Sequence, residues 1–346
     1  MQGRPRPGNH GTTAAAASGH HRPAVRAVLP LALALTLVAT GCGSDDADPQ
    51  PTTAATTAVT SPEPSPSPSQ SASPTVAVDD LDGLEFTVGE SFWHSGYMVT
   101  LDSGSVEAER DTFDEVTGHT LTVAGTFENL GEDTFWFGPD LVIVQPDATY
   151  ESSNLGDVPE AAGGLSVAGE LTFPVDEAFD PDQAVLVVGT ADQAQAEVPL
   201  QPAAGDLVDL PPMEADVQGT MSVDPLDVEV VAAERRWDIP VDHDQAPAGE
   251  QALTLHLTVT SRKTGNWGLP DGSFVLLTPD GTSLPVDGSD MGGSLAGSEA
   301  GTDHEGLYLR FLVPEDASGQ YALRMDPPEY WFADEPAEAE LAFTLE

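Results

Sequence analysis

QALTLHLTVTS, residues 251–261, alternates apolar and polar side chains along its length. A second segment, HTLTVAGTFEN at residues 119–129, has the same pattern. A period of two predicts β-strands with one face in a core and the other in water. The side chains expected to face the core are Leu121, Val123 and Phe127 in the earlier segment and Leu253, Leu255, Leu257 and Val259 in the later one.

The sequences that follow these two segments repeat several unlike features in one order. Each copy continues with a tryptophan and a Pro-Asp pair, then a strand that runs into a Pro-Asp turn, a Gly-rich loop, an alternating strand and a proline followed by an acid. The matched positions are Trp136 and Trp267, Pro139-Asp140 and Pro270-Asp271, Pro146-Asp147 and Pro279-Asp280, and Pro174 and Pro314. This order favours a tandem duplication over two unrelated β domains.

Short alternating segments separated by Gly, Pro, Asp and Asn predict an all-β fold, and their number favours sandwiches over one open sheet. We expect a first β-sandwich domain at residues 81–201, a linker at 202–219 and a second β-sandwich domain at 220–346. The linker is placed where Pro211-Pro212 and neighbouring acids interrupt the strand pattern.

Residues 1–42 read as an export signal. Arginines without acidic residues precede the apolar run Val28–Ala39, which as a helix would rise about 18 Å, short of the roughly 30 Å of a hydrocarbon core. Ala39, Thr40 and Gly41 precede Cys42, and this resembles the bacterial lipobox, although Ala39 stands where Leu or Val is usual. The resemblance implies a diacylglyceryl group on Cys42 that anchors the protein to the outer face of the cell membrane. The alternative is plain cleavage that leaves a free thiol.

Residues 43–80 are rich in Ser, Thr and Pro and lack the apolar side chains that a core needs, so they predict a disordered tether. An exported module with such a tether resembles the immunoglobulin-like β-sandwich domain of unknown function found on Gram-positive lipoproteins. The resemblance rests on Val88-Gly89-Glu90-Ser91, the strand Tyr97–Leu101 and the strand end Glu128-Asn129, and it is looser in the second copy. It implies two tandem immunoglobulin-like domains and carries over no catalytic residue.

All 58 acidic residues follow Cys42, but only seven of the 11 basic residues do, so the chain beyond the leader carries a formal charge of −51. Such a polyanion gains nothing from counterion release, and nucleic acid is therefore excluded as a partner. The acidity suits solubility or spacing from an anionic envelope, and it also raises the alternative of cation binding.

Two groups of side chains are candidate metal ligands. Imidazole beside carboxylate suits a transition metal if two loops meet, and clustered carboxylates suit calcium. The candidates are Asp242, His243, Asp244, Asp303, His304 and Glu305 for the first kind of site, and Asp176, Glu177, Asp180 and Asp182 for the second. Solvent-exposed loop side chains are the competing interpretation, and His94, His119 and His256 are expected to lie on the surface.

The sequence contains no serine elbow, Cys-His pair, phosphate-binding glycine loop or His-Glu-x-x-His motif. We therefore expect no enzyme activity and no cofactor, and a bound divalent cation is the alternative. The expected function is noncatalytic binding or scaffolding by a cell-surface lipoprotein, with an unidentified protein or cell-wall partner. The alternative is an extracytoplasmic protein that binds calcium, zinc or copper.

Overall fold

Strands form where apolar and polar side chains alternate, because an extended backbone sends successive side chains to opposite faces. A computed structural model of the chain describes residues 81–153, 159–266, 269–291, 295, 299–326 and 339–346. Over these residues the predicted all-β class is confirmed, with antiparallel sheets. The described part contains no α-helix, only the 3-10 turn η1 (Asp271–Ser273), and hence no helix long and apolar enough to cross a membrane.

The predicted leader at 1–42, including Cys42, and the predicted tether at 43–80 lie outside the described residues, as does Trp267. Residues of both hydrophobic cores fall within one compact unit that ends at Glu346.

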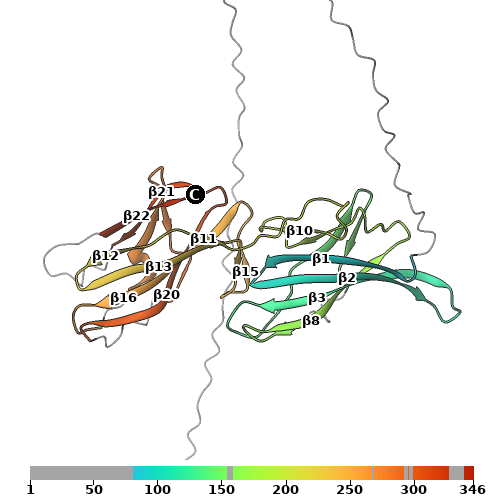
Figure 1. Ribbon diagram of the computed structural model, residues 1–346, viewed down its shortest axis with the longest axis horizontal. Helices are drawn as coiled ribbons and strands as arrows, with labels where there is room; N and C mark the ends of the chain where they lie inside the picture. The colour runs from blue at the N-terminus through green and yellow to red at the C-terminus, as the bar shows by residue number, and fades with distance from the viewer. Residues whose placement is uncertain (1–80, 154–158, 267–268, 292–294, 296–298, 327–338) are drawn as a thin grey trace, which may run out of the picture. The chain divides into compact units, whose positions relative to one another are not determined.

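Two four-stranded sheets enclose the first hydrophobic core, with strand orders β1-β2-β3-β8 and β10-β9-β5-β6. The strands of the first sheet lie side by side in Figure 1. Their bounds are β1 (Leu84–His94), β2 (Tyr97–Arg110), β3 (Val116–Asn129) and β8 (Ser166–Val175). Those of the second sheet are β5 (Leu141–Gln145), β6 (Ala148–Glu151), β9 (Val185–Val188) and β10 (Ala196–Pro199). A small pair, β4 (Phe135–Trp136) with β7 (Glu160–Ala161), lies apart from both sheets.

The second core is enclosed in the same way. In one sheet, β13 pairs on one side with both β11 and β12 and on the other side with β16, and β20 and β19 follow β16. The facing sheet has the strand order β18-β17-β21-β22. The bounds in the first of these sheets are β11 (Met213–Ala215), β12 (Gly219–Val223), β13 (Leu226–Arg236), β16 (Glu250–Ser261), β19 (Gly288–Ser289) and β20 (Thr302–Pro314). In the second they are β17 (Phe274–Leu277), β18 (Ser283–Pro285), β21 (Gly319–Met325) and β22 (Ala339–Leu345).

The two cores share one strand order, and parts of their register match. The series β1-β2-β3-β8 corresponds to β12-β13-β16-β20, and β10-β9-β5-β6 corresponds to β22-β21-β17-β18. Leu121 pairs with Phe173 in the first core, and Leu253 pairs with Phe311 at the matching place in the second. The register of β2 against β3 and of β13 against β16 also shifts after the fifth residue of β2 and of β13. The second half of the described chain thus repeats the topology of the first.

The core-facing side chains predicted from alternation are buried in both cores. Leu165 precedes β8 and 59% of its surface is exposed, whereas Leu171 and Phe173 within the strand are buried. Residues 202–219 also differ from a bare linker. Leu210 is buried in the first core, Val217 is buried in the second, and β11 extends the sheet beside β13. The connecting segment therefore contributes to both cores.

Candidate functional site

A thirteen-residue connection, 237–249, joins β13 to β16 and contains the small hairpin β14 (Asp238–Ile239) and β15 (Asp244–Gln245). This connection, here called the clasp, leaves the second core and packs on loops of the first. Trp237 packs against the first core at its start. At the tip, His243 has a φ of 52°, a left-handed conformation that turns the chain sharply.

The tip of the clasp fits against the first core because two glycines leave room for it. The His243 ring stacks on Phe135, with ring centroids 4.0 Å apart and planes 9° from parallel. A Cβ atom on Gly131 would lie 2.6 Å from His243 Cε1, and one on Gly96 would lie 2.9 Å from the Cα of Pro240. Side chains at these two glycines would force the clasp outward.

Hydrogen bonds fix the base of the clasp. The buried Gln245 side chain accepts a bond from the backbone N–H of Ser95 (2.9 Å) and donates one to the carbonyl of Ala194 (3.0 Å). The backbone N–H of Ala194 donates to the carbonyl of Ala246 (2.9 Å), and that of Ala248 donates to the carbonyl of Asp192 (3.0 Å). Buried backbone groups that lose such partners cost about 1–3 kcal/mol each, so the clasp is held in one position.

Arginines fasten the clasp to the sheet of its own core. Arg236 donates two bonds to the carboxylate of buried Asp238 (2.9 and 3.0 Å). Arg310 on β20 donates to Asp242 at the clasp tip (2.6 Å) and to Asp287 (2.8 Å). Both guanidinium groups border a pocket of about 510 Å³ over β13, β16 and β20, and the carboxylates neutralise them there. Burial raises the pKa of Asp238, although Arg236 opposes that rise.

A smaller pocket of about 280 Å³ lies beside the clasp and is lined by His94, Phe135, Trp136 and His243, among others. His94 is 1% exposed, so its expected surface position is wrong. The error arose because His94 ends a strand whose sequence does not show what covers it. Burial lowers the pKa of His94 to about 4 and also lowers the pKa of His243, where Asp133 and Asp242 oppose the shift.

A serine lies beside His94, but the pair lacks the arrangement of a catalytic triad. Ser95 Oγ is 2.9 Å from His94 Nδ1, whereas His94 Nε2 has no hydrogen-bond partner among the described residues. In a triad the second ring nitrogen binds a carboxylate that orients and stabilises the imidazolium. An imidazole with a pKa of about 4 is also a weak general base at neutral pH.

The two histidine loops proposed as a transition-metal site do not meet. Asp242 binds Arg310, which pairs in register with Thr254, whereas Asp303 pairs with Thr260 and accepts a hydrogen bond from its hydroxyl (2.7 Å). Six residues along a strand amount to roughly 20 Å. His304 and Glu305 lie on β20 next to Asp303. Asp244 is exposed, and its carboxylate accepts a hydrogen bond from the backbone N–H of Gln245.

Two of the four carboxylates proposed for calcium, Asp176 and Asp180, accept hydrogen bonds from protein donors. Asp176 accepts bonds from the Tyr150 hydroxyl (2.8 Å) and the N–H of Ala178 (2.9 Å). Asp180 accepts bonds from the N–H of Asp182 (3.0 Å) and the amide of Gln183 (2.6 Å), while Glu177 is exposed. Within the described residues, no three His, Cys, Asp or Glu side chains gather into a group that could hold a metal ion.

Three positions that now stand out were not identified as functional in the sequence. Gln245 gave no signal, because a glutamine in a loop is usually exposed. Arg310 interrupts the otherwise largely apolar run Leu307–Val313 of β20 and offered a weak signal of a buried ion pair. Phe113, with 83% of its surface exposed, is the one aromatic residue between the acids of the turn Asp111–Glu115.

Compared with known proteins, the chain matches no family model, no curated protein and no solved structure. Its class therefore rests on its own fold, which is an all-β protein with two cores, a clasp from the second core to loops of the first, and ordered turns that present aromatic side chains.

Proposed function

We propose that the protein is an exported lipoprotein whose two immunoglobulin-like β-sandwich modules bind a partner at the cell envelope without catalysing a reaction. The observation that carries this proposal is the repetition of one strand order in both cores, with matching register at Leu121–Phe173 and Leu253–Phe311. It supports a tandem duplication, and together with the export signal ending at Cys42 it suits an extracellular scaffold.

The side chains free for recognition lie outside the cores. In a sandwich, loops at the ends of the sheets carry binding, while the strands hold them in place. Trp136, 46% exposed beside the smaller pocket, and Phe113 on the β2–β3 turn are two such side chains. They support a role in binding, because an ordered exposed aromatic residue offers large contact area at low entropic cost.

The anchor is tested by labelling cells that produce the protein with an alkyne analogue of palmitate. We expect label on the wild-type chain and none on Cys42→Ser, which should also be released into the medium. Ser44→Ala, two residues beyond the anchor, is the matched control and should keep the label. If the wild-type chain carries no label and its Cys42 thiol is free, the protein is secreted without a lipid anchor.

A further inference from the structure

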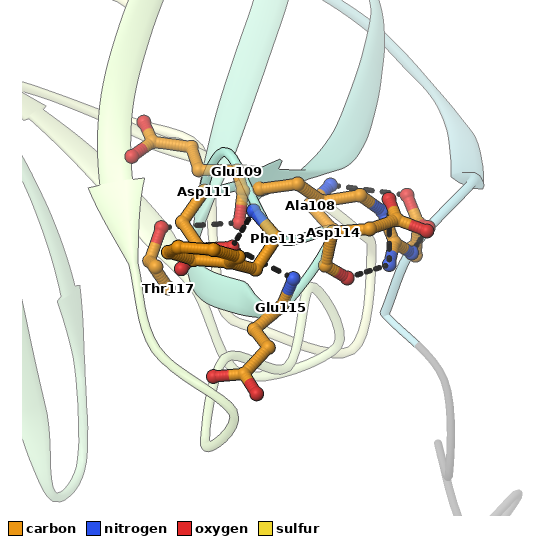
Figure 2. A network of polar contacts seen from close by, with 9 residues as sticks. Ala108, Glu109, Asp111, Phe113, Asp114, Glu115 and Thr117 are labelled. Carbon is orange, nitrogen blue, oxygen red and sulfur yellow. Dashed lines mark hydrogen bonds and ion pairs between the residues drawn. The ribbon is translucent and has the colours of Figure 1, made fainter.

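The turn between β2 and β3 is ordered by the carboxylate of Asp111 together with backbone hydrogen bonds. Asp111 Oδ1 accepts bonds from the N–H groups of Phe113 (2.8 Å) and Glu115 (2.9 Å), as Figure 2 shows. The N–H of Asp111 donates to the carbonyl of Glu115 (2.9 Å), and Asp114 takes the left-handed conformation at a φ of 67°. Five residues are thereby held in one conformation, and we call residues 111–115 the hairpin tip.

The base of the tip is tied to the start of the first module. Arg110 donates to Asp82 (2.9 Å), and the N–H of Ala108 donates to the same carboxylate (3.0 Å). These two donors lower the pKa of Asp82, so the carboxylate stays ionised at neutral pH. Phe113 is therefore presented from a braced hairpin.

An ordered phenylalanine in water is apolar surface that the fold itself does not use. Phe113 is 83% exposed, and Val116 beside it is 48% exposed. Burying such side chains in a partner removes apolar surface from water, and this favours binding. Because the tip is already ordered, binding loses little conformational entropy there.

The charges around Phe113 indicate the kind of partner. Glu109, Asp111, Asp114 and Glu115 are all exposed close to Phe113 in sequence. Anionic lipid head groups would repel these carboxylates, and so would a second copy of this acidic chain. A protein with an apolar pocket inside a basic rim complements both the phenylalanine and the acids.

The second module supplies a precedent for docking at this place in the fold. The clasp occupies the position between β13 and β16 that the hairpin tip occupies between β2 and β3. The clasp packs on loops of a β-sandwich through an aromatic stack and backbone hydrogen bonds. The corresponding element of the first module has no such contact within the described residues, where Phe113 remains exposed.

We infer that the hairpin tip is a protein-docking element that inserts Phe113 into an apolar pocket of a cationic partner protein. The inference rests on the proposed noncatalytic binding function, and it names the contacting residues and the chemistry of the partner.

The test uses the chain from residue 43 onward and three fluorescent peptides of about 16 residues, long enough to form a helix. One carries leucines and lysines, one leucines and glutamates, and one serines and lysines. We expect the Leu/Lys peptide to bind at least about tenfold more tightly than the Ser/Lys peptide, and the Leu/Glu peptide not to bind.

Phe113→Ser should abolish the preference for the Leu/Lys peptide, whereas Leu165→Ser, a matched control at an exposed leucine of the same module, should keep it. Asp114→Asn combined with Glu115→Gln should weaken Leu/Lys binding while Phe113 stays in place. Circular dichroism melting checks that each variant folds.

Equal binding of the Leu/Lys and Ser/Lys peptides, or a preference that survives Phe113→Ser, would overturn docking through the tip. Such a result would leave the Cys42 labelling experiment untouched, so the failure of docking and the failure of anchoring remain separate outcomes.

Discussion

At the scale of single residues, burial decides what each histidine and each carboxylate can do. His94 is buried at the end of β1, and the His243 ring stacks on Phe135. Neither imidazole is therefore the exposed side chain that its neighbours in the sequence suggest. Asp242 accepts a hydrogen bond from Arg310. Asp242 and His243 thus help to position the clasp.

The pKa of His94 predicts a pH dependence of stability. Its folded pKa of about 4 lies below the ordinary 6.5, so the unfolded chain binds the proton more readily. The loss of folding stability begins as the pH falls below 6.5, the pKa of His94 in the unfolded chain, and is complete below about 4, its pKa in the folded protein. At pH 4.5 it amounts to roughly 2 to 3 kcal/mol of unfolding free energy, at 1.36 kcal/mol per pKa unit.

Urea denaturation of the wild type and of His94→Asn between pH 7 and pH 4.5 measures this effect. Asparagine keeps an acceptor near Ser95 Oγ but does not titrate. The wild type should lose roughly 2 to 3 kcal/mol more than the variant over that range. If the unfolding free energy of the two proteins falls equally with pH, His94 is solvated in the folded protein. The many exposed carboxylates titrate in both proteins and cancel in the comparison.

At the scale of elements, the clasp and the hairpin tip are two versions of one connection. The thirteen-residue connection between β13 and β16 reaches the first core, whereas the connection between β2 and β3 is only five residues long. The glycines that receive the clasp, Gly96 and Gly131, lie in loops of the first core. Docking therefore depends on small residues in one module and a long loop in the other.

Gly131→Ala should loosen the clasp without disturbing either core. The added methyl would lie 2.6 Å from His243 Cε1 and 2.7 Å from the carbonyl oxygen of Pro240, and overpacking of this kind costs about 1–3 kcal/mol. Hydrogen exchange at the amides of Ala194 and Ala248 should become about tenfold faster or more.

Gly118→Ala is the control for this change, because its nearest non-local neighbour is a flexible glutamate oxygen at 3.7 Å. It should leave exchange at both clasp amides unchanged. If Gly131→Ala also leaves exchange at these amides unchanged, packing at the tip does not hold the clasp in place. The hydrogen bonds at its base are then sufficient.

At the scale of the whole molecule, charge is the dominant property. The first module, residues 81–200, contains 24 acidic residues and one basic residue, Arg110. Most of these carboxylates are exposed, and Arg110 pairs with Asp82. Self-repulsion therefore acts against the folded state, and salt should relieve it.

The melting temperature should rise as sodium chloride increases from about 0.01 M to about 1 M, since the Debye length falls from about 30 Å to about 3 Å. Calorimetry of the chain from residue 43 onward at several salt concentrations measures this, with sucrose as a control for solvent exclusion. A flat or falling curve would mean that the carboxylates are too far apart to interact.

The sequence by itself determined the all-β class, the inward rows of both long strands and the matching order of features in two halves. These depend on alternation and on turn residues, which act within a few residues along the chain. Leu121 and Leu253, for example, are buried where alternation placed them.

Only the tertiary structure decided that the Asp242-His243-Asp244 loop docks on the first core, that His94 is enclosed, and that Phe113 stands in water. Each of these outcomes depends on which distant segment covers a side chain. Periodicity reports that a strand has an inner face, but it cannot report what packs against the ends of the strands, because those contacts join residues that lie as many as 150 positions apart.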